Sequence, residues 1–220
     1  MFSEQMILVT LQGLGESLYM TLLSTLVSYI IGLPLGLILV VTDKNGIHPN
    51  APVNQILGAI VNILRSVPFL ILLVAVVPIT RFITGTSIGS TATVVPLVIA
   101  AAPFVARVVE SSIKEVDRGV IEASLSMGAS TLQVVRKVLV PEAMPSLLTG
   151  LALSLTTILS YSAMAGFVAG GGLGAIAINY GYYRGQTDIM LLMVVILVII
   201  VQVFQGIGNW VARRADKRIR

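Results

Sequence analysis

The polar residues that could carry a function in this chain are concentrated in one stretch, residues 117–141, which reads DRGVIEASLSMGASTLQVVRKVLVP. The stretch carries Arg118, Glu122, Arg136 and Lys137 between long apolar runs. Charged side chains are costly in hydrocarbon, so these residues have to lie in water or against another protein. They offer no pairing of a nucleophile with a base and no cluster of metal ligands, which speaks against a membrane enzyme. We interpret the stretch as the contact through which another molecule drives the movement of this chain.

Other kinds of chemistry find little support in the sequence. There is no G-x-x-x-x-G-K-[ST] phosphate-binding loop, so the chain is not expected to hydrolyse ATP itself. Glu110 follows Arg107 by three residues at the end of an apolar run, where it suits an ion pair better than a proton relay. Cysteine is absent, and the lone His48 lacks the three or four ligands of a metal site. No basic stripe with interleaved aromatics suggests nucleic acid.

The composition identifies an integral membrane protein. Of the 220 residues, 56% are hydrophobic and 11% are charged, and the mean hydropathy is +0.96. Soluble domains carry about 25% charged residues. The first 17 residues contain no Lys or Arg, whereas a secretory signal begins with a basic segment. We therefore expect the first span to remain in the protein.

Apolar runs long enough to cross a bilayer predict an all-α protein with about five transmembrane helices. Short interfacial helices are expected over 5–15 and 54–65, and the glycine-rich segment 169–188 suits a re-entrant or interfacial position. Gly32 and Gly36 have the spacing that lets two helices approach closely. The predicted spans are residues 17–41, 66–82, 91–110, 147–169 and 189–210.

The distribution of basic residues orients the chain. Lys44, Lys114, the stretch 117–141 and the five basic residues of the C-terminal tail fall on one side if the N-terminus is outside. The positive-inside rule then gives an N-out, C-in topology with the polar stretch in the cytosol. No internal repeat is visible, so an inverted-repeat secondary transporter is not supported.

Within 117–141 the capping signals predict two short helices. Asp117 is suited to the N-cap of the first helix, and Gly128 to the left-handed position that follows it. Ser130 and Gln133 have the spacing of a capping box at the start of the second helix, which Pro141 is expected to end. Such a hairpin could dock into a groove of a soluble protein or lie on the membrane surface, and periodicity leaves both open. Its predicted apolar stripe consists of Ile121, Leu125, Leu132, Val135 and Leu139.

A longer pattern distinguishes these two possibilities. Glu122-Ala123-Ser124, three residues, Gly128, nine residues and Val138-x-Val140-Pro141 resemble the EAA loop of ABC importer permeases, Glu-Ala-Ala, three, Gly, nine, Ile-x-Leu-Pro. Ser124 stands where the family has alanine, and valines stand for its isoleucine and leucine. Residues 61–73, 95–110 and 161–183 extend the resemblance to the permeases of bacterial methionine importers over nearly the whole chain.

The resemblance implies a type I ABC importer permease fold, with residues 1–220 forming one transmembrane domain of the bacterial inner (cytoplasmic) membrane. Two permease copies would pair with two copies of a cytosolic ATPase, which binds the ATP and Mg, and this chain would hold no cofactor. A periplasmic or lipoprotein methionine-binding protein would deliver the substrate. Within the cytosolic coupling hairpin 117–141, the residues expected to contact the ATPase are Ile121, Glu122, Ala123, Ser124, Leu125, Met127, Gly128 and Ala129.

Two further sets of residues are candidates for the transport path. The fourth span is rich in hydroxyls, and its Ser160, Tyr161, Ser162 and Met164 are expected to face the substrate; the Met164 thioether could contact a methionine side chain or only fill space. The glycines expected at the outer gate and the binding-protein contact are Gly85, Gly89, Gly170, Gly171, Gly172 and Gly174. Alternatives are a permease for another amino acid and a channel or secondary transporter that works alone.

Overall fold

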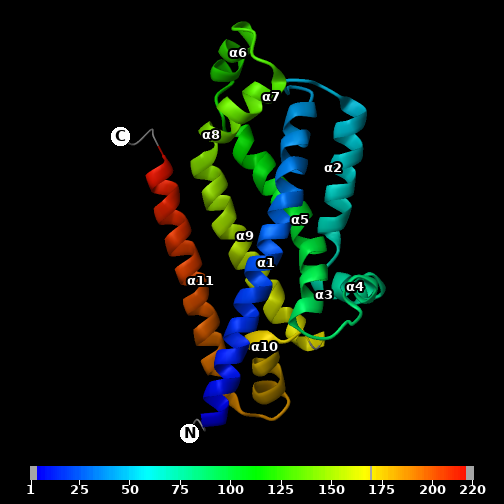
Figure 1. Cartoon of the computed structure of the whole chain (residues 1–220), viewed down its shortest axis with the longest axis vertical. Helices are drawn as coiled ribbons and strands as arrows, with labels where there is room; N and C mark the ends of the chain where they lie inside the picture. The colour runs from blue at the N-terminus through cyan, green and yellow to red at the C-terminus, as the bar shows by residue number, and fades with distance from the viewer. Residues whose placement is uncertain (1–3, 169, 217–220) are drawn as a thin grey trace. The chain divides into compact units, whose positions relative to one another are not determined.

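The computed structural model describes residues 4–168 and 170–216, and every regular element within them is helical (Figure 1). Among these residues four helices are long and apolar enough to cross a membrane, and a fifth span results if α2 and α3 are counted together. In order, the elements are α1 (Glu4–Thr42), α2 (Ala51–Ser66), α3 (Phe69–Ala75), α4 (Val77–Thr84), α5 (Ser90–Lys114), α6 (Arg118–Ser126), α7 (Thr131–Val134), η1 (Val135–Leu139), α8 (Val140–Glu142), α9 (Met144–Ala165), η2 (Gly166–Val168), α10 (Gly172–Ile176), η3 (Ala177–Tyr182) and α11 (Thr187–Ala215).

The first helix is continuous over 39 residues, so the separate interfacial helix predicted for 5–15 is wrong. Its beginning packs against the glycine-rich segment instead of standing apart. A Cβ atom on Gly13 would lie 2.4 Å from the Ile176 side chain and 3.4 Å from the backbone of Gly172. Because Gly13 has no side chain, α1 can continue past this point while touching α10.

The second predicted span, 66–82, is also wrong as a single helix. The chain bends by 101° between α2 and α3, and α3 ends at Ala75 before α4 begins at Val77. Pro68 favours an extended conformation at Val67, and Pro78 has no N–H to continue the hydrogen bonds of α3. The two prolines thus divide one apolar run into a bend and two short helices.

The chain forms two compact units, and each is built from three separate parts of the sequence. The first consists of the chain up to Val27 with Val67–Ala101 and Leu155–Gln205, and the second of Ser28–Ser66, Ala102–Ser154 and the chain from Gly206 on. Apolar side chains fill both cores. Met20, Phe69, Leu97 and Ile158 are at the centre of one cluster in the first unit. The second unit has a cluster around Val105, Val109, Ile113 and Leu139.

The predicted close approach at Gly32 and Gly36 is confirmed within the second unit. A Cβ atom on Gly32 would lie 2.7 Å from the carbonyl oxygen of Ala102, and one on Gly36 would lie 2.6 Å from that of Ala106. Both distances are shorter than any contact that a real Cβ makes. The backbone of α1 therefore touches the backbone of α5, which only glycine allows.

We expect Gly32→Ala to destabilise the protein by about 1–3 kcal/mol, because the added methyl group forces two helix backbones apart. The measurement is the midpoint of thermal unfolding in detergent. Gly15→Ala is the matched control on the same helix, since a Cβ there meets nothing within 4 Å. Replacing an exposed helical glycine by alanine gains up to about 1 kcal/mol, so this control should be neutral or stabilising. Equal effects of the two substitutions would contradict the close contact.

Candidate functional site

The first helix of the polar hairpin has both of its predicted ends. Asp117 is the N-cap of α6, and its Oδ1 accepts a hydrogen bond of 2.8 Å from the backbone N–H of Gly119. At the other end Gly128 has a φ of 81°, its N–H donates to the carbonyl of Leu125, and the N–H of Ala129 donates to that of Ser124. This pair of bonds is the Schellman arrangement, in which a left-handed residue satisfies the last carbonyls of a helix.

The second helix begins as predicted but does not end where expected. Ser130 and Gln133 form the predicted capping box at the start of α7. The prediction that Pro141 ends this helix is wrong, because the chain continues through the π-helical η1 into α8. Pro141 lies in the first turn of α8, directly after the π-helical segment η1.

The apolar stripe predicted along the hairpin divides into two groups. Ile121, Val135 and Leu139 pack into the core of the second unit. The other two stripe residues are exposed, Leu125 by 38% and Leu132 by 65%, and Met127 beside the stripe is 81% exposed. Apolar side chains that remain exposed on a charged segment are typical of a surface that a partner covers.

The EAA-like residues lie on α6 with different exposures. Glu122 and Ala123 are exposed, whereas Ser124 is buried and its hydroxyl donates to the carbonyl of Val120 at 2.8 Å. A serine hydroxyl that bonds back to its own helix needs no other partner. Ser124 can therefore stand where the family pattern has alanine without leaving a buried polar group unsatisfied.

An ion-pair network lies toward the C-terminal end of α5 in the second unit. The predicted pair of Arg107 and Glu110 is present, and Lys114 bridges Glu110 at 2.8 Å and Asp43 at 3.0 Å. Arg107 also donates to Asn62 Oδ1 at 2.8 Å. The backbone N–H of Asn45, and then the ammonium of Lys114, hold the pKa of Asp43 below its usual value. The network ties α2, α5 and the segment after α1 together, and sequence reasoning missed Asp43 and Asn62 because their partners are distant in sequence.

The predicted pathway residues of α9 do not share one face. Ser160 and Met164 are exposed one turn apart, and the Ser160 hydroxyl donates back to the Thr156 carbonyl. The Ser162 hydroxyl is buried and donates to the carbonyl of Leu159. The ring of Tyr161 stacks on Phe69, with centroids 4.6 Å apart and planes within 4°. Sequence reasoning did not single out Phe69.

The two glycine segments predicted at the outer gate meet at Thr93 in the first unit. The Thr93 Oγ1 atom lies 2.9 Å from the carbonyl oxygen of Gly89 and 3.3 Å from that of Gly170. Left-handed φ values at Gly85, Gly89, Gly171 and Gly172 form the turns on both sides of this contact. A Cβ on Gly174 would lie 2.2 Å from the Ala163 carbonyl oxygen, so the segment packs as closely as predicted.

The same segment is attached to α1 through two side chains that sequence reasoning missed. Glu16 Oε2 accepts a hydrogen bond of 2.7 Å from the N–H of Gly172, and its Oε1 accepts one from Gln12. The Ser17 hydroxyl accepts one of 2.9 Å from the N–H of Leu173. These acceptors satisfy the N–H groups at the start of α10, which no earlier carbonyl of the helix can reach. Glu16 falls between the predicted helix 5–15 and the predicted span 17–41, and no local pattern indicates a partner 156 residues away.

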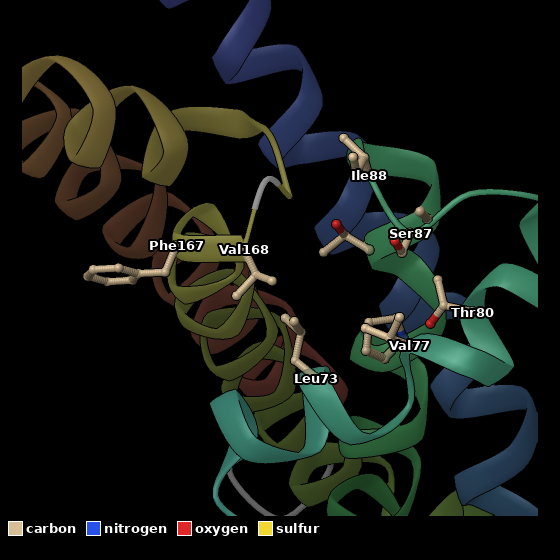
Figure 2. A pocket seen from close by; sticks show the side chains of 10 residues that line it. Leu73, Val77, Thr80, Ser87, Ile88, Phe167 and Val168 are labelled. Carbon is tan, nitrogen blue, oxygen red and sulfur yellow. The ribbon is translucent and has the colours of Figure 1, made fainter. Parts of the chain in front are cut away.

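A cavity of about 330 Å³ lies beside the gate glycines of the first unit. Figure 2 shows Leu73, Val77, Thr80, Ser87 and Ile88 around it, and Val168 directed toward Leu73 while Phe167 points away. The lining is mainly apolar with a few hydroxyls. Ser87 and Ile88 come from the turn between Gly85 and Gly89, so this turn forms part of the cavity wall.

Comparison with known proteins assigns the chain to a family. The model of the binding-protein-dependent transport system inner membrane component family matches residues 17–220. The chain belongs to this family. The match includes the hairpin, the ion-pair network and both glycine segments, so every site residue predicted from the sequence lies within the matched part.

Individual family members and solved structures are similar over most of their length. The probable D-methionine transport system permease protein MetI of Vibrio cholerae serotype O1 is 52% identical over 203 residues, which are 92% of this chain and 90% of that protein. An inward-facing structure of the MetNI methionine ABC transporter is 46% identical, with a TM-score of 0.97, covering 98% of this chain and 100% of that one. The crystal structure of an amino acid ABC transporter with histidines is 21% identical, with a TM-score of 0.78, covering 97% of this chain and 100% of that one. At this identity the likeness shows the fold alone.

These likenesses confirm the predicted fold class. The permease is an all-α integral membrane protein with the type I ABC importer fold. The resemblance drawn from the EAA-like pattern is likewise confirmed by the family model and by the relatives.

We expect Glu16→Ala to loosen the start of α10, because it removes an anionic acceptor whose hydrogen bonds stabilise the contact by about 1–3 kcal/mol. Hydrogen exchange of peptides covering residues 170–176 should become faster. Glu16→Gln, which keeps an acceptor oxygen, should have a smaller effect, and Gln12→Ala controls for loss of the exposed neighbour. Unchanged exchange in Glu16→Ala would show that the carboxylate does not hold this segment.

Proposed function

We propose that this chain is the permease subunit of an ATP-driven ABC importer that moves methionine across the bacterial inner membrane by alternating access. The observation that carries the proposal is the likeness to the MetNI methionine transporter over 98% of the chain at 46% identity. The V. cholerae relative, named a probable D-methionine permease, supports the same substrate class. The transport system at 21% identity shares only the fold and does not favour another amino acid.

The complete transporter would contain two copies of this chain and two copies of a cytosolic ATPase. Residues 1–220 act as one transmembrane domain with the N-terminus outside and the C-terminus inside, and a pathway at the two-fold axis between copies is the simplest closed arrangement. The ATPase binds the ATP and Mg, since the sequence of this chain has no phosphate-binding loop. A periplasmic or lipoprotein binding protein supplies methionine from outside.

The hairpin is the part of the permease that the ATPase moves. Its exposed Leu125 and Met127 provide apolar contact, and the Glu122 carboxylate provides a charge beside them. An amphipathic helix that enters a groove uses such a mixture of anchors. The coupling surface comprises the exposed Glu122, Ala123, Leu125, Met127 and Gly128, together with Ile121, Ser124 and Ala129, which are buried or half-buried and hold the exposed residues in place.

The transport path and the outer gate are assigned to the first unit. Ser160 and Met164, which are exposed on one face of α9, would contact the substrate, whereas Tyr161 and the buried Ser162 lie on other faces of the helix and would support the path from behind. The Thr93 contact between the glycine segments supports a gate made of Gly85, Gly89, Gly170, Gly171, Gly172 and Gly174. Because glycines tolerate left-handed backbone, these turns can be tight where the binding protein would dock.

The proposal is tested by uptake of labelled methionine into proteoliposomes that contain this chain, its ATPase and its binding protein. We expect uptake to require ATP and the binding protein, and methionine to stimulate ATP hydrolysis more than histidine or leucine does. Uptake without ATP would indicate a stand-alone transporter instead. Stimulation by another amino acid but not by methionine would refute the substrate assignment while leaving the importer class intact.

We expect Met127→Glu to weaken the complex with the ATPase without lowering the thermal stability of the permease, because Met127 is 81% exposed. Burying an unpaired carboxylate in an apolar groove costs several kcal/mol, so co-purification and ATP-driven uptake should fall at least about tenfold. Leu132→Glu is the matched control, since Leu132 is also an exposed apolar residue of the hairpin but lies outside the coupling surface. If both variants lose the ATPase equally, residues 121–129 are not the specific contact.

A further inference from the structure

Arg65 is a charged residue near the end of α2, and its helix runs into the membrane. In the proposed orientation α2 begins beside the cytosolic end of α1, where the Asn54 side chain donates to the Leu39 carbonyl at 2.7 Å. It then follows the spanning helices of the second unit (Figure 1), since Val61 packs in one cluster with Leu39 of α1 and Ala106 of α5. α2 therefore extends away from the cytosol into the bilayer instead of lying on its surface.

Two helices place Arg65 near the middle of the bilayer. Arg65 follows Asn54 by eleven residues, which is about 16 Å along α2 at 1.5 Å per residue. On α5, Arg107 precedes Lys114 by seven residues, or about 10 Å. Arg107 bonds to Asn62, and Arg65 lies almost one turn beyond that contact. The hydrocarbon core is about 30 Å thick, and arginines that snorkel to the headgroups lie near its edges, so Arg65 is too deep to do so.

The Arg65 side chain is exposed and unpaired at this depth. Among residues 4–168 and 170–216, no ion pair or hydrogen bond engages it. Two rows of exposed side chains run along α2. The apolar row consists of Ile56, Ile60 and Ile63. The polar row consists of Gln55, Asn62 and Ser66. Arg65 flanks the polar row on the side away from the isoleucines. Because an unpaired charge inside a membrane needs water or a functional partner, this side of α2 suits the wall of a water-filled path.

The backbone next to Arg65 offers acceptors of the opposite character. α2 ends at Ser66, and the last carbonyls of a helix have no donor within it. The Leu64 carbonyl receives none from the residue four positions on, because that residue is Pro68. The aligned peptides give this helix end a partial negative charge. A guanidinium that attracts an anion thus lies beside a helix end that attracts a cation.

We propose that this end of α2 binds the backbone of the transported amino acid in its zwitterionic form. The Arg65 guanidinium takes the carboxylate, because its planar fork matches the two carboxylate oxygens. The terminal carbonyls of α2 take the ammonium. The inference rests on the proposed function and deepens it, since it names a group that recognises the part common to all amino acids and leaves the choice among side chains to other residues.

Cysteine labelling tests whether this side of α2 faces water. The chain has no native cysteine, so Ser66→Cys introduces a single thiol next to Arg65. Ile60→Cys, in the apolar row of the same helix, is the matched control. Each variant, assembled with the ATPase in phosphatidylcholine nanodiscs, is treated with a charged, water-soluble thiosulfonate, and labelling of this chain is followed by mass spectrometry. Ser66→Cys should react, and Ile60→Cys should stay unlabelled over the same time.

Methionine should protect the thiol of Ser66→Cys. At about ten times its dissociation constant it should slow labelling about tenfold, because only the unoccupied fraction reacts. Two matched probes keep its thioether chain: methylthiopropylamine lacks the carboxylate, and methylthiobutanoate lacks the ammonium. Both should need concentrations about tenfold or more higher for equal protection, because each loses one charge-assisted contact.

Substitution of Arg65 separates carboxylate binding from a structural role. Added to Ser66→Cys, Arg65→Gln should raise the dissociation constant of methionine about tenfold or more and leave that of methylthiopropylamine unchanged, whereas a structural role would affect both equally. Arg65→Lys keeps the charge without the fork and should recover part of the affinity. ATP-driven methionine uptake should fall in the same order, and Arg213→Gln, at an exposed arginine of α11, should leave it unchanged. If Arg65→Gln fails to assemble, the comparison of the three probes with Arg65 intact still decides.

Other results overturn the assignment. No labelling of Ser66→Cys would place this side of α2 against lipid or a second copy of the chain. Labelling without protection by methionine, or protection that survives Arg65→Gln, would place the substrate elsewhere. Protection by phosphatidylglycerol nanodiscs, with no further effect of methionine, would assign Arg65 to a lipid phosphate. Uptake by the Ser66→Cys preparation separates the two proposals, since intact methionine uptake without protection refutes only the Arg65 site, whereas protection without ATP-driven uptake refutes only the transport function.

Discussion

Direct contact between helix backbones is the constraint on which the rest of this permease depends. In a bilayer the lipid tails are as apolar as the helix surfaces, so helices are held together by close packing and by hydrogen bonds. In the second unit Gly32 and Gly36 bring α1 against α5 at the carbonyls of Ala102 and Ala106. In the first unit Gly174 brings α10 against the Ala163 carbonyl of α9, and Gly13 leaves room on α1 for the Ile176 side chain. Each of these contacts fixes the position of a helix that carries or adjoins candidate residues.

Polar side chains add hydrogen bonds and ion pairs between the helices that the glycines bring into contact. Once the backbones are close, short side chains can reach across: Glu16 and Ser17 accept from Gly172 and Leu173, and Thr93 lies between Gly89 and Gly170. In the second unit, the ion pairs of Glu110 with Arg107 and Lys114 lie toward the C-terminal end of α5. These paired charges thereby lie toward the end of a span, where their desolvation is incomplete and costs less than in the bilayer centre.

The sequence predicts local features well and contacts between distant residues poorly. Asp117, Gly128 and the Ser130–Gln133 box define the hairpin because capping depends on residues only a few positions apart. The EAA-like spacing identifies the family for the same reason. The predicted helix end at Pro141 is wrong because the helix continues through a π-helical segment before it. The predicted single span over 66–82 is wrong because hydrophobic periodicity does not indicate the 101° bend. Glu16 and Phe69 escape notice since their partners lie about 90 to 156 residues away and no local pattern marks them.

The two caps of α6 bear on how it could associate with a partner. Asp117 and the Schellman turn at Gly128 use only bonds internal to the segment, so α6 keeps its shape whether or not a partner is present. A preorganised helix loses little conformational entropy on association. Ile121 and Leu139 also join it to the core that contains α5. Under the proposed coupling, a displacement of α6 by the ATPase would therefore also displace this core.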